Sequence, residues 1–346
     1  MNKVHPASNK RAPRETYMPN NAYICADMAK KMFIVALLML SSLPALAEGR
    51  LSVLFWNVEN LFDCRHDTLQ NDFEFLPDGT RHWTPSRYWH KLDNIARTLA
   101  AATEADGDWP MLVGLAEVEN DSCMFDLTRR STLRTAGYRY VMTDCADARG
   151  IDVALLYQPE RFRLLDWHSV RIPSEVHGLA PTRDILYVCG QTAIGDTLHV
   201  VVVHLPSRAG NKRGSARHRR LAAETLRHLT DSLLGKQLLV MGDFNTSPRD
   251  ALFRTLAPPL VSLMPQSRRE LRRARGTYVF QGQWSYLDHM LVSPQLLPFV
   301  AEQRAEPLAF PFLLNEKGRP WRTYQGPAYV GGFSDHLPLR LVLKWE

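Results

Sequence analysis

The sequence predicts an α/β sandwich in which two mixed β-sheets are flanked by helices. Its apolar runs are mostly short, often β-branched and bounded by Gly, Pro, Asn or Asp, which is typical of buried strands. Many of these runs follow one another with no helical segment between them, which argues against a simple alternating parallel sheet. The composition, 45% apolar and 23% charged, excludes a disordered, collagenous or coiled-coil chain.

The apolar runs give the expected elements in chain order. Strands are expected at 51–56, 111–116, 153–157, 185–188, 198–203, 238–241, 287–292 and 339–345. Helices, which show apolar residues at three-to-four spacing, are expected at 85–102, 124–134 and 216–234. No internal repeat or linker divides residues 48–346, so we expect one domain there.

Residues 28–47 have the pattern of a secretory signal peptide. Lys30 and Lys31 precede a short apolar run, and Ala-Leu-Ala at 45–47 supplies the small-x-small cleavage pattern. A transmembrane anchor is the alternative, but the run is shorter than the roughly 20 residues that a spanning helix needs. Residues 1–27 are then expected to be a non-native extension. We expect an exported protein, periplasmic or extracellular, with no stable membrane anchor.

The net charge says little about partners once this leader is excluded. The whole chain has 42 Lys+Arg and 36 Asp+Glu, a net charge of +6. Residues 1–47 hold six of the basic and two of the acidic residues, so 36 against 34 remain, or +2. Binding to a polyanion must therefore depend on local clusters of charge.

Export also bears on the cysteines. Four remain after the leader, Cys64, Cys123, Cys145 and Cys189, and they allow three disulfide pairings between which the sequence cannot choose. None of them has the spacing of a Cys/His metal site.

Polar side chains recur where the expected strands end. Asn57 follows the apolar run in LSVLFWNVE, and Glu117 follows the run in MLVGLAEVEN. Either residue alone could be an ordinary turn residue. In QLLVMGDFN, Asp243 and Asn245 come straight after a buried run and, two residues apart, share one side of an extended backbone.

Three further segments extend this pattern. GGFSDHLPL places Asp335 and His336 just before the last strand, and four valines run into His204 in LHVVVVHLPSR. In WSYLDHMLVS, Asp288 interrupts an apolar strand, where a carboxylate is costly unless it is paired or hydrogen-bonded.

Taken in order, N…E…H…GDFN…LD…SDH, these clusters resemble the endonuclease/exonuclease/phosphatase family of metal-dependent phosphodiesterases. That family includes DNase I-like nucleases, exonuclease III-like repair enzymes, inositol phosphatases and bacterial sphingomyelinases. The resemblance covers nearly all of residues 51–345, and EVEN, HLPSR and GTYVFQGQWSYLDHM are similar to its secreted bacterial branch. It implies a four-layer, DNase I-like α/β sandwich and a catalytic domain at 48–346.

The resemblance also implies a role for each cluster. Asn57, Glu117 and Asp335 would hold a hard divalent cation, Mg²⁺ or Mn²⁺, through oxygen atoms. Asp243 would orient or deprotonate the attacking water, and Asn245 would donate to a non-bridging phosphate oxygen.

The remaining roles concern the histidines and their partners. His336 would be a charged electrophile held by Asp288, and His204 would contact the phosphate or protonate the leaving oxygen. Asp152, in RGIDVALLY, is a candidate catalytic partner of His204, and Arg149 is a candidate clamp for the substrate phosphate.

The substrate is expected to be a nucleic acid. Segment 207–220 contains no acid and offers Arg208, Arg213 and Arg217 as substrate-binding candidates for backbone phosphates. The alternative is a solvated loop that leads into a helix. We therefore expect a secreted, monomeric, metal-dependent nuclease that uses in-line attack of water.

Two other classes stay open: a lipid or small-molecule phosphoesterase, such as a sphingomyelinase or inositol phosphatase, and a non-catalytic binding protein of the same fold. The last ranks lowest, because every position of the expected centre holds a competent side chain.

Overall fold

The computed structural model describes residues 49–207, 212–250, 259–265, 267–273 and 275–345. Residues Glu48–Glu346 form one compact unit by their internal contacts. The expected extension at 1–27 and the expected signal peptide at 28–47 lie outside the described residues. Within the described ranges, no helix combines the length and the apolar character that crossing a bilayer requires.

One mixed sheet is built around the first strand of the domain. Its strands are β1 (Gly49–Leu61), β2 (Leu112–Val118), β3 (Arg139–Met142), β4 (Asp152–Tyr157), β13 (Glu306–Pro307) and β16 (Leu339–Trp345). Their order is β13-β16-β1-β2-β4-β3. Strand β1 runs parallel to β2 and antiparallel to β16. The parallel pair brings the carboxyl ends of β1 and β2 to the same edge.

The second mixed sheet has a similar parallel pair near its centre. Its strands are β5 (Phe162–Val170), β6 (Ile185–Thr192), β7 (Thr197–His204), β8 (Gln237–Asp243), β9 (Val261–Ser262) and β12 (Asp288–Val292). Their order is β5-β6-β7-β8-β12-β9. Strand β7 runs parallel to β8, and β12 runs antiparallel to β8.

The helices and short elements complete the described fold. The described helices are α2 (Pro85–Asp106), α3 (Asp121–Phe125), α4 (Lys212–Ser232) and α6 (Arg268–Arg273). One small hairpin pairs β10 (Tyr278–Phe280) with β11 (Gln283–Ser285), and a second pairs β14 (Tyr324–Gln325) with β15 (Ala328–Tyr329). A π-helical turn covers Asp126–Arg130. Short 3₁₀ turns cover Phe73–Phe75, Thr132–Ala136, Glu175–His177, Leu297–Phe299, Ala301–Gln303 and Pro311–Leu313.

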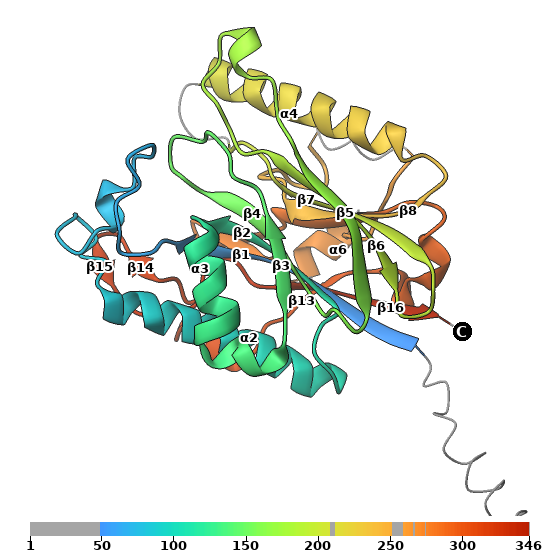
Figure 1. Cartoon of the computed structure of the whole chain (residues 1–346), viewed down its shortest axis with the longest axis horizontal. Helices are drawn as coiled ribbons and strands as arrows, with labels where there is room; N and C mark the ends of the chain where they lie inside the picture. Colours follow the sequence, from blue (N-terminus) through green and yellow to red (C-terminus); the bar gives the residue numbers. More distant parts are fainter. Residues whose placement is uncertain (1–48, 208–211, 251–258, 266, 274, 346) are drawn as a thin grey trace, which may run out of the picture. The chain divides into compact units, whose positions relative to one another are not determined.

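The alternation of side chains along the strands builds the layers. Val53 in β1 and Val200 in β7 belong to one apolar core that lies between the two sheets. Their neighbours point the other way, because side chains alternate with a period of two. Leu54 packs in a core shared with α2, and Val201 packs in a core shared with α4. Figure 1 shows α2 and α4 on opposite outer faces, which confirms the expected four-layer sandwich of two mixed sheets.

The expected elements are present, with two instructive differences. All eight expected strands form, and the expected helices at 85–102 and 216–234 correspond to α2 and α4. The expected single helix at 124–134 is instead α3 followed by a π-helical turn and a 3₁₀ turn. There the Ser131 hydroxyl accepts from the Leu133 backbone N–H, which starts a new turn. Strand β5 was not expected, because as an edge strand its side chains are mostly exposed and form no apolar run.

Candidate active site

The ends of four strands bring the central residues together. Asn57 lies in β1 and Glu117 in β2, while His204 and Asp243 end β7 and β8 as register partners. The Asn57 Nδ2 donates to Glu117 Oε1 at 3.3 Å and to Asp243 Oδ2 at 3.1 Å. One buried carboxamide therefore joins the acidic ends of both sheets.

Asn57 shows a different orientation from the expected one. Its Oδ1 accepts the backbone N–H of Glu59 at 3.0 Å, so the nitrogen and not the oxygen faces the carboxylates. In this conformation Asn57 orients Glu117 and Asp243. Its oxygen keeps a second lone pair beside this hydrogen bond, so the expectation that Asn57 helps to hold a cation stays a prediction.

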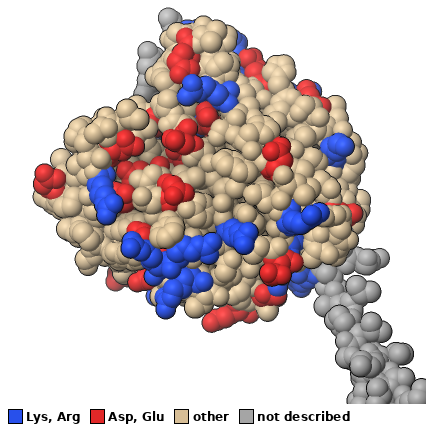
Figure 2. Space-filling model, in the orientation of Figure 1, with Lys and Arg blue, Asp and Glu red and all other residues tan. Residues whose placement is uncertain are grey.

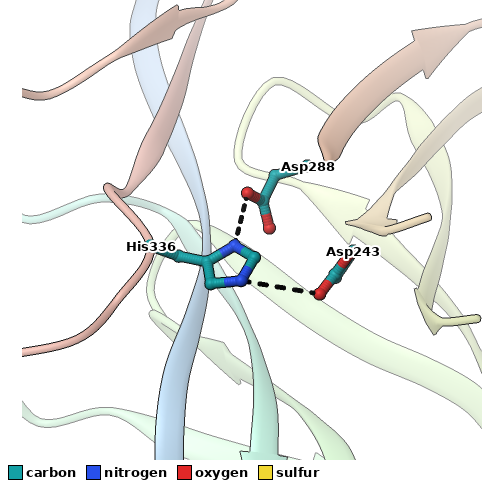
Figure 3. A group of neighbouring side chains, drawn as sticks. All are labelled: Asp243, Asp288 and His336. Carbon is teal, nitrogen blue, oxygen red and sulfur yellow. Dashed lines mark hydrogen bonds and ion pairs between the residues drawn. The ribbon is translucent and has the colours of Figure 1, made fainter. Parts of the chain in front are cut away.

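A second group joins Asp243 to two residues that are distant in sequence. Asp288, which begins β12, is the register partner of Asp243, and His336 precedes β16. The His336 Nδ1 lies 2.8 Å from Asp288 Oδ2, and its Nε2 lies 3.9 Å from Asp243 Oδ2. Figure 3 shows the imidazole between the two carboxylates. All three side chains are buried, and the expected contact between Asp288 and His336 is present.

Burial and charge set the protonation of this group. Burial by itself lowers the pKa of His336, but the nearby carboxylates, above all Asp288, outweigh it and raise this pKa well above the ordinary value. Burial, together with the charge of Asp288, raises the pKa of Asp243 to about 7, although His336 opposes this. The group therefore holds a charged imidazole beside a carboxyl group that gains or loses its proton near neutral pH.

His204 is a neutral histidine at the same centre. Its Nε2 lies 3.7 Å from Asp243 Oδ2 and 3.9 Å from Glu117 Oε1. Complete burial, and then the charges of Arg183, Arg149 and His336, hold the pKa of His204 well below its ordinary value. Since only Nε2 faces acceptors, we assign the proton of the neutral ring to this nitrogen.

The expected pairing of Asp152 with His204 does not form. The Asp152 carboxylate accepts from the Thr143 hydroxyl and from the Cys145 backbone N–H, and within the described residues His204 Nδ1 is buried with no hydrogen-bond partner. Burial raises the pKa of Asp152 to about 6. The reason is local, because Asp152 begins β4 and its side chain closes the turn that leads from β3.

Asn245 lies beside Asp243 in the left-handed backbone region, at φ +49, which asparagine tolerates better than most residues. Its backbone N–H donates to Asp243 Oδ1 at 2.8 Å. Its Nδ2 donates to the Leu205 carbonyl at 3.0 Å, so this amide already has one partner in the protein. Among the described residues this amide has no second acceptor, so its other N–H bond is available to a phosphate oxygen.

Arg149 reaches the rim of the centre, as the sequence suggested. Its Nη2 lies 3.8 Å from Glu117 Oε2 and donates to Asn60 Oδ1 at 2.9 Å. Its side chain is half exposed, so it can meet a ligand from solvent. Glu117 Oε2 also accepts the Asn60 backbone N–H at 3.0 Å, which fixes the carboxylate at this rim.

Sequence reasoning missed Arg322 and Glu59, which accompany Asp335. The Arg322 guanidinium forms an ion pair with Asp335 Oδ2, and its Nε lies 3.6 Å from Glu59 Oε1. Asp335 Oδ1 lies 4.0 Å from His336 Nε2. The sequence contained only a weak signal for these two residues. Glu59 follows Asn57 by two residues, whereas Arg322 precedes Asp335 by 13 residues, and no spacing rule links that pair.

The structure describes only part of the expected basic contact region. Arg208 lies outside the described residues, as does the side chain of Arg213. Arg217 is exposed on α4, and its Nη2 donates to the His177 carbonyl at 3.2 Å. Elsewhere in the fold, the thiols of Cys64, Cys123, Cys145 and Cys189 are all free.

The centre fits a divalent cation. Asp243 and Asp288 carry carboxylate oxygens that lie within 4.8 Å of each other and of a His336 ring nitrogen, while the charged imidazole itself has no lone pair for a metal. Among the described residues, Asp288 Oδ1 is buried with no hydrogen-bond partner. Glu117 and Asp335 add two carboxylates with exposed fractions of 13% and 21%, so they are open to solvent. Oxygen donors of this kind are the ligands that hard divalent cations prefer.

The fold and this acidic, histidine-containing centre are features of an α/β-sandwich hydrolase. Residues 52–345 match the model of the Endonuclease/Exonuclease/phosphatase family. The match covers most of the chain, so the protein belongs to this family, and the assignment expected from the motifs is confirmed. The nucleases and phosphatases in the family's name both hydrolyse phosphoester bonds, so membership supports phosphoesterase activity.

Solved structures share the fold at low sequence identity. Humanised D. rerio TDP2 is 16% identical with a TM-score of 0.55, over 86% of this chain and 99% of that chain. An endonuclease/exonuclease/phosphatase family protein from Bacteroides thetaiotaomicron is also 16% identical with a TM-score of 0.55, over 86% and 98%. The mannosyl-6-phosphatase of the same species is 15% identical with a TM-score of 0.53, over 85% and 100%. No curated protein sequence matches the chain.

Proposed function

We propose that this chain is an exported, divalent-metal-dependent phosphodiesterase of the secreted bacterial branch and that its substrate is nucleic acid. The observation that carries the catalytic part is the buried group of Asp243, Asp288 and His336 beside Glu117. It combines a carboxyl group whose pKa is raised to about 7 with an imidazole whose raised pKa favours the charged form. A positioned proton acceptor and a positive charge near the phosphate both accelerate hydrolysis of a phosphoester by water.

Each residue of the centre has its own role in the proposed hydrolysis. Asp243 orients the attacking water and takes its proton, for which a pKa near 7 is well suited. His336, held in its charged form by Asp288, donates to a phosphate oxygen as negative charge develops on it. A bound Mg²⁺ or Mn²⁺, held by Glu117 and Asp335, would neutralise the same developing charge. His204 Nε2 lies 3.7 Å from Asp243 Oδ2 and 3.9 Å from Glu117 Oε1, beyond hydrogen-bond distance, and would contact a phosphate oxygen that enters the centre.

The nucleic-acid part of the proposal depends on local basic groups. Arg149 and Arg322 reach the two acidic sides of the centre, and segment 207–220 follows His204 directly with basic residues and no acid. Figure 2 shows separate groups of basic side chains with acidic side chains between them, so the face drawn there does not present one continuous basic field. Separate groups of basic side chains support contacts to a few substrate phosphates near the scissile bond, and not to a long stretch of nucleic-acid backbone.

Similar solved structures support two substrate classes. One of them is D. rerio TDP2 in complex with a single-strand DNA product, and another is a mannosyl-6-phosphatase. The second class, a small phosphomonoester, is therefore the competing candidate. The export part of the proposal depends on the signal-peptide pattern at 28–47, and the mature enzyme would then be periplasmic or extracellular and monomeric.

One experiment tests the substrate and the centre together. Purified residues 48–346 are incubated with single- and double-stranded DNA, RNA, sphingomyelin, inositol phosphates and a sugar 6-phosphate, with Mg²⁺, Mn²⁺ or chelator. We expect metal-dependent cleavage of a polynucleotide, its loss in Asp243→Asn, and its retention in the matched surface variant Asp231→Asn. Cleavage of the sugar phosphate alone would overturn the nuclease proposal, and activity in Asp243→Asn equal to wild type would overturn the assignment of the centre.

A further inference from the structure

Helix α2 buries a lysine on a face that is otherwise largely apolar. The face packs Leu92, Ile95 and Leu99 against the first sheet. Lys91 lies among them with only 1% of its surface exposed. Burying an ammonium group is unfavourable unless the group is paired and hydrogen-bonded. The contacts of Lys91 therefore indicate what this residue does.

Lys91 joins two chain segments that both lead to the active centre. Its Nζ donates to Thr323 Oγ1 at 2.7 Å and to the Phe333 carbonyl at 2.6 Å. Three residues further along α2, Asn94 Nδ2 donates to the Gly332 carbonyl at 3.0 Å. Helix α2 thus donates hydrogen bonds to the adjacent backbone carbonyls of residues 332 and 333 and to the side-chain hydroxyl of residue 323.

The two segments are also in direct backbone contact. Phe333 N–H donates to the Trp321 carbonyl at 2.6 Å. A Cβ atom on Gly332 would lie 2.2 Å from the same carbonyl oxygen, so only glycine allows this approach. Lys91 bridges the segments at the point where they pack most closely.

Both segments continue directly into groups of the centre. Phe333 is followed by Ser334, whose hydroxyl donates to the Asn57 carbonyl at 2.7 Å and accepts the His336 backbone N–H at 3.0 Å. Asp335 lies between these two anchors. Arg322, which forms the ion pair with Asp335, is the neighbour of Thr323.

Charge links Lys91 to the same groups. The backbone N–H of Thr323 donates to Glu59 Oε2 at 2.6 Å, and Glu59 in turn approaches Arg322. Burial lowers the pKa of Lys91 to about 8, while the carboxylates of Glu59, Asp335 and Glu117 act in the opposite direction. The charges of these three carboxylates favour the ammonium form of Lys91.

We propose that Lys91 is a positioning residue that holds Thr323 and Phe333 at a fixed spacing and so presents the Asp335 carboxylate, with its Arg322 partner, to a divalent cation. This inference rests on the proposed function for the identity of the ligand. The competing interpretation is that Lys91 merely stabilises the packing of α2.

Cation binding without substrate separates the two interpretations. Mn²⁺ is titrated calorimetrically into the full domain, 48–346, as wild type, as Lys91→Met and as Leu99→Ala. Leu99 is fully buried on the same helix and takes no part in the hydrogen bonds of Lys91 and Asn94, so its truncation disturbs α2 packing and leaves those hydrogen-bonding groups in place. We expect Lys91→Met to weaken Mn²⁺ binding by about 10–100-fold, the range seen when an outer partner of a metal ligand is lost, and Leu99→Ala to leave it unchanged.

A readout on the metal-free protein completes the test. Amide hydrogen exchange at residues 333–337 should accelerate in Lys91→Met and not in Leu99→Ala. If Lys91→Met does not fold, Thr323→Val, which keeps the shape but removes the acceptor of Lys91, should weaken Mn²⁺ binding in the same direction.

The outcomes are distinguishable. Equal Mn²⁺ affinity in wild type and Lys91→Met, or in wild type and Thr323→Val, overturns the positioning role. Equal losses in Lys91→Met and Leu99→Ala assign Lys91 to packing alone. If wild type itself neither binds Mn²⁺ nor hydrolyses a phosphoester, the proposed function fails first.

Discussion

The pair of Asp288 and His336 gives the sharpest test of the proposed chemistry. The perturbation is Asp288→Asn, which keeps the shape of the side chain and removes its charge. In the wild type, the carboxylate lies 2.8 Å from the imidazole and both side chains are buried. Without this charge, burial would disfavour the charged imidazole, so less of it would face the phosphate at neutral pH.

The structure sets the size of the effect. Loss of a positioned acid or base costs about 10²–10⁴-fold in rate, which is about 3–5 kcal/mol of transition-state stabilisation at about 1.4 kcal/mol per tenfold. A loss of about 10²–10⁴-fold in kcat follows. Asp243 remains 3.9 Å from the other ring nitrogen and still favours the charged form, so the lower half of this range is expected. KM should change much less, because the pair acts on the reaction step.

The assay is steady-state hydrolysis of a nucleic-acid or chromogenic phosphodiester substrate, with circular dichroism to confirm folding. Wild type, Asp288→Asn, His336→Ala and the double variant form a thermodynamic cycle. His336→Ala should cost at least as much as Asp288→Asn, and the double variant should be little worse than the poorer single variant. Additive losses in the cycle would refute the reasoning, as would an Asp288→Asn enzyme with wild-type kcat.

Three further predictions concern the cation, the basic segment and pH. Glu117→Gln should raise the Mg²⁺ or Mn²⁺ concentration needed for half-maximal activity by about tenfold or more without changing the circular dichroism spectrum; full wild-type activity in excess chelator would contradict it. Arg213→Ala with Arg217→Ala should raise KM for a polynucleotide far more than for a small chromogenic phosphodiester and should flatten the salt dependence; equal losses on both substrates would instead assign these arginines to the reaction centre. Burial, with nearby carboxylates, raises the pKa of Glu119 to about 9 from its ordinary 4.5, so the folded state keeps a proton that the unfolded state releases. This contribution to stability is complete below about pH 4.5 and is lost as the pH rises towards about 9. Tm of wild type should therefore fall relative to Glu119→Gln across that window, and parallel Tm curves would show that Glu119 is already ionised in the folded state.

The sequence by itself determined the class of fold and most members of the centre. Both follow from local patterns, since a short β-branched run makes a buried strand, and the residue after it lies at the edge of the sheet. Asp288 shows how far such reasoning reaches. A carboxylate inside an apolar strand must find a partner, and the partner, His336, is 48 residues away.

Tertiary structure decided which of these residues work together and in what state. The isolated motif does not show that Asn57 turns its amide nitrogen to the carboxylates. Nor does it show that Asp152 bonds to Thr143, so that among the described residues His204 Nδ1 has no hydrogen-bond partner. The protonation of His204 and His336 could not be deduced either. Both are histidines at strand ends, yet burial and nearby charge move their pKa values in opposite directions.

The contacts of Lys91 and Arg322 also could not be predicted from the sequence. A lysine in a helix is expected at the surface, because lysine side chains are rarely buried, and no spacing along the chain links an arginine in a loop to a particular carboxylate. Only folding brings Lys91 to the Phe333 carbonyl and Arg322 to Asp335. Hydrogen bonding, burial and Coulomb interaction depend on the distance between groups in space. The number of residues between two groups along the chain does not determine that distance.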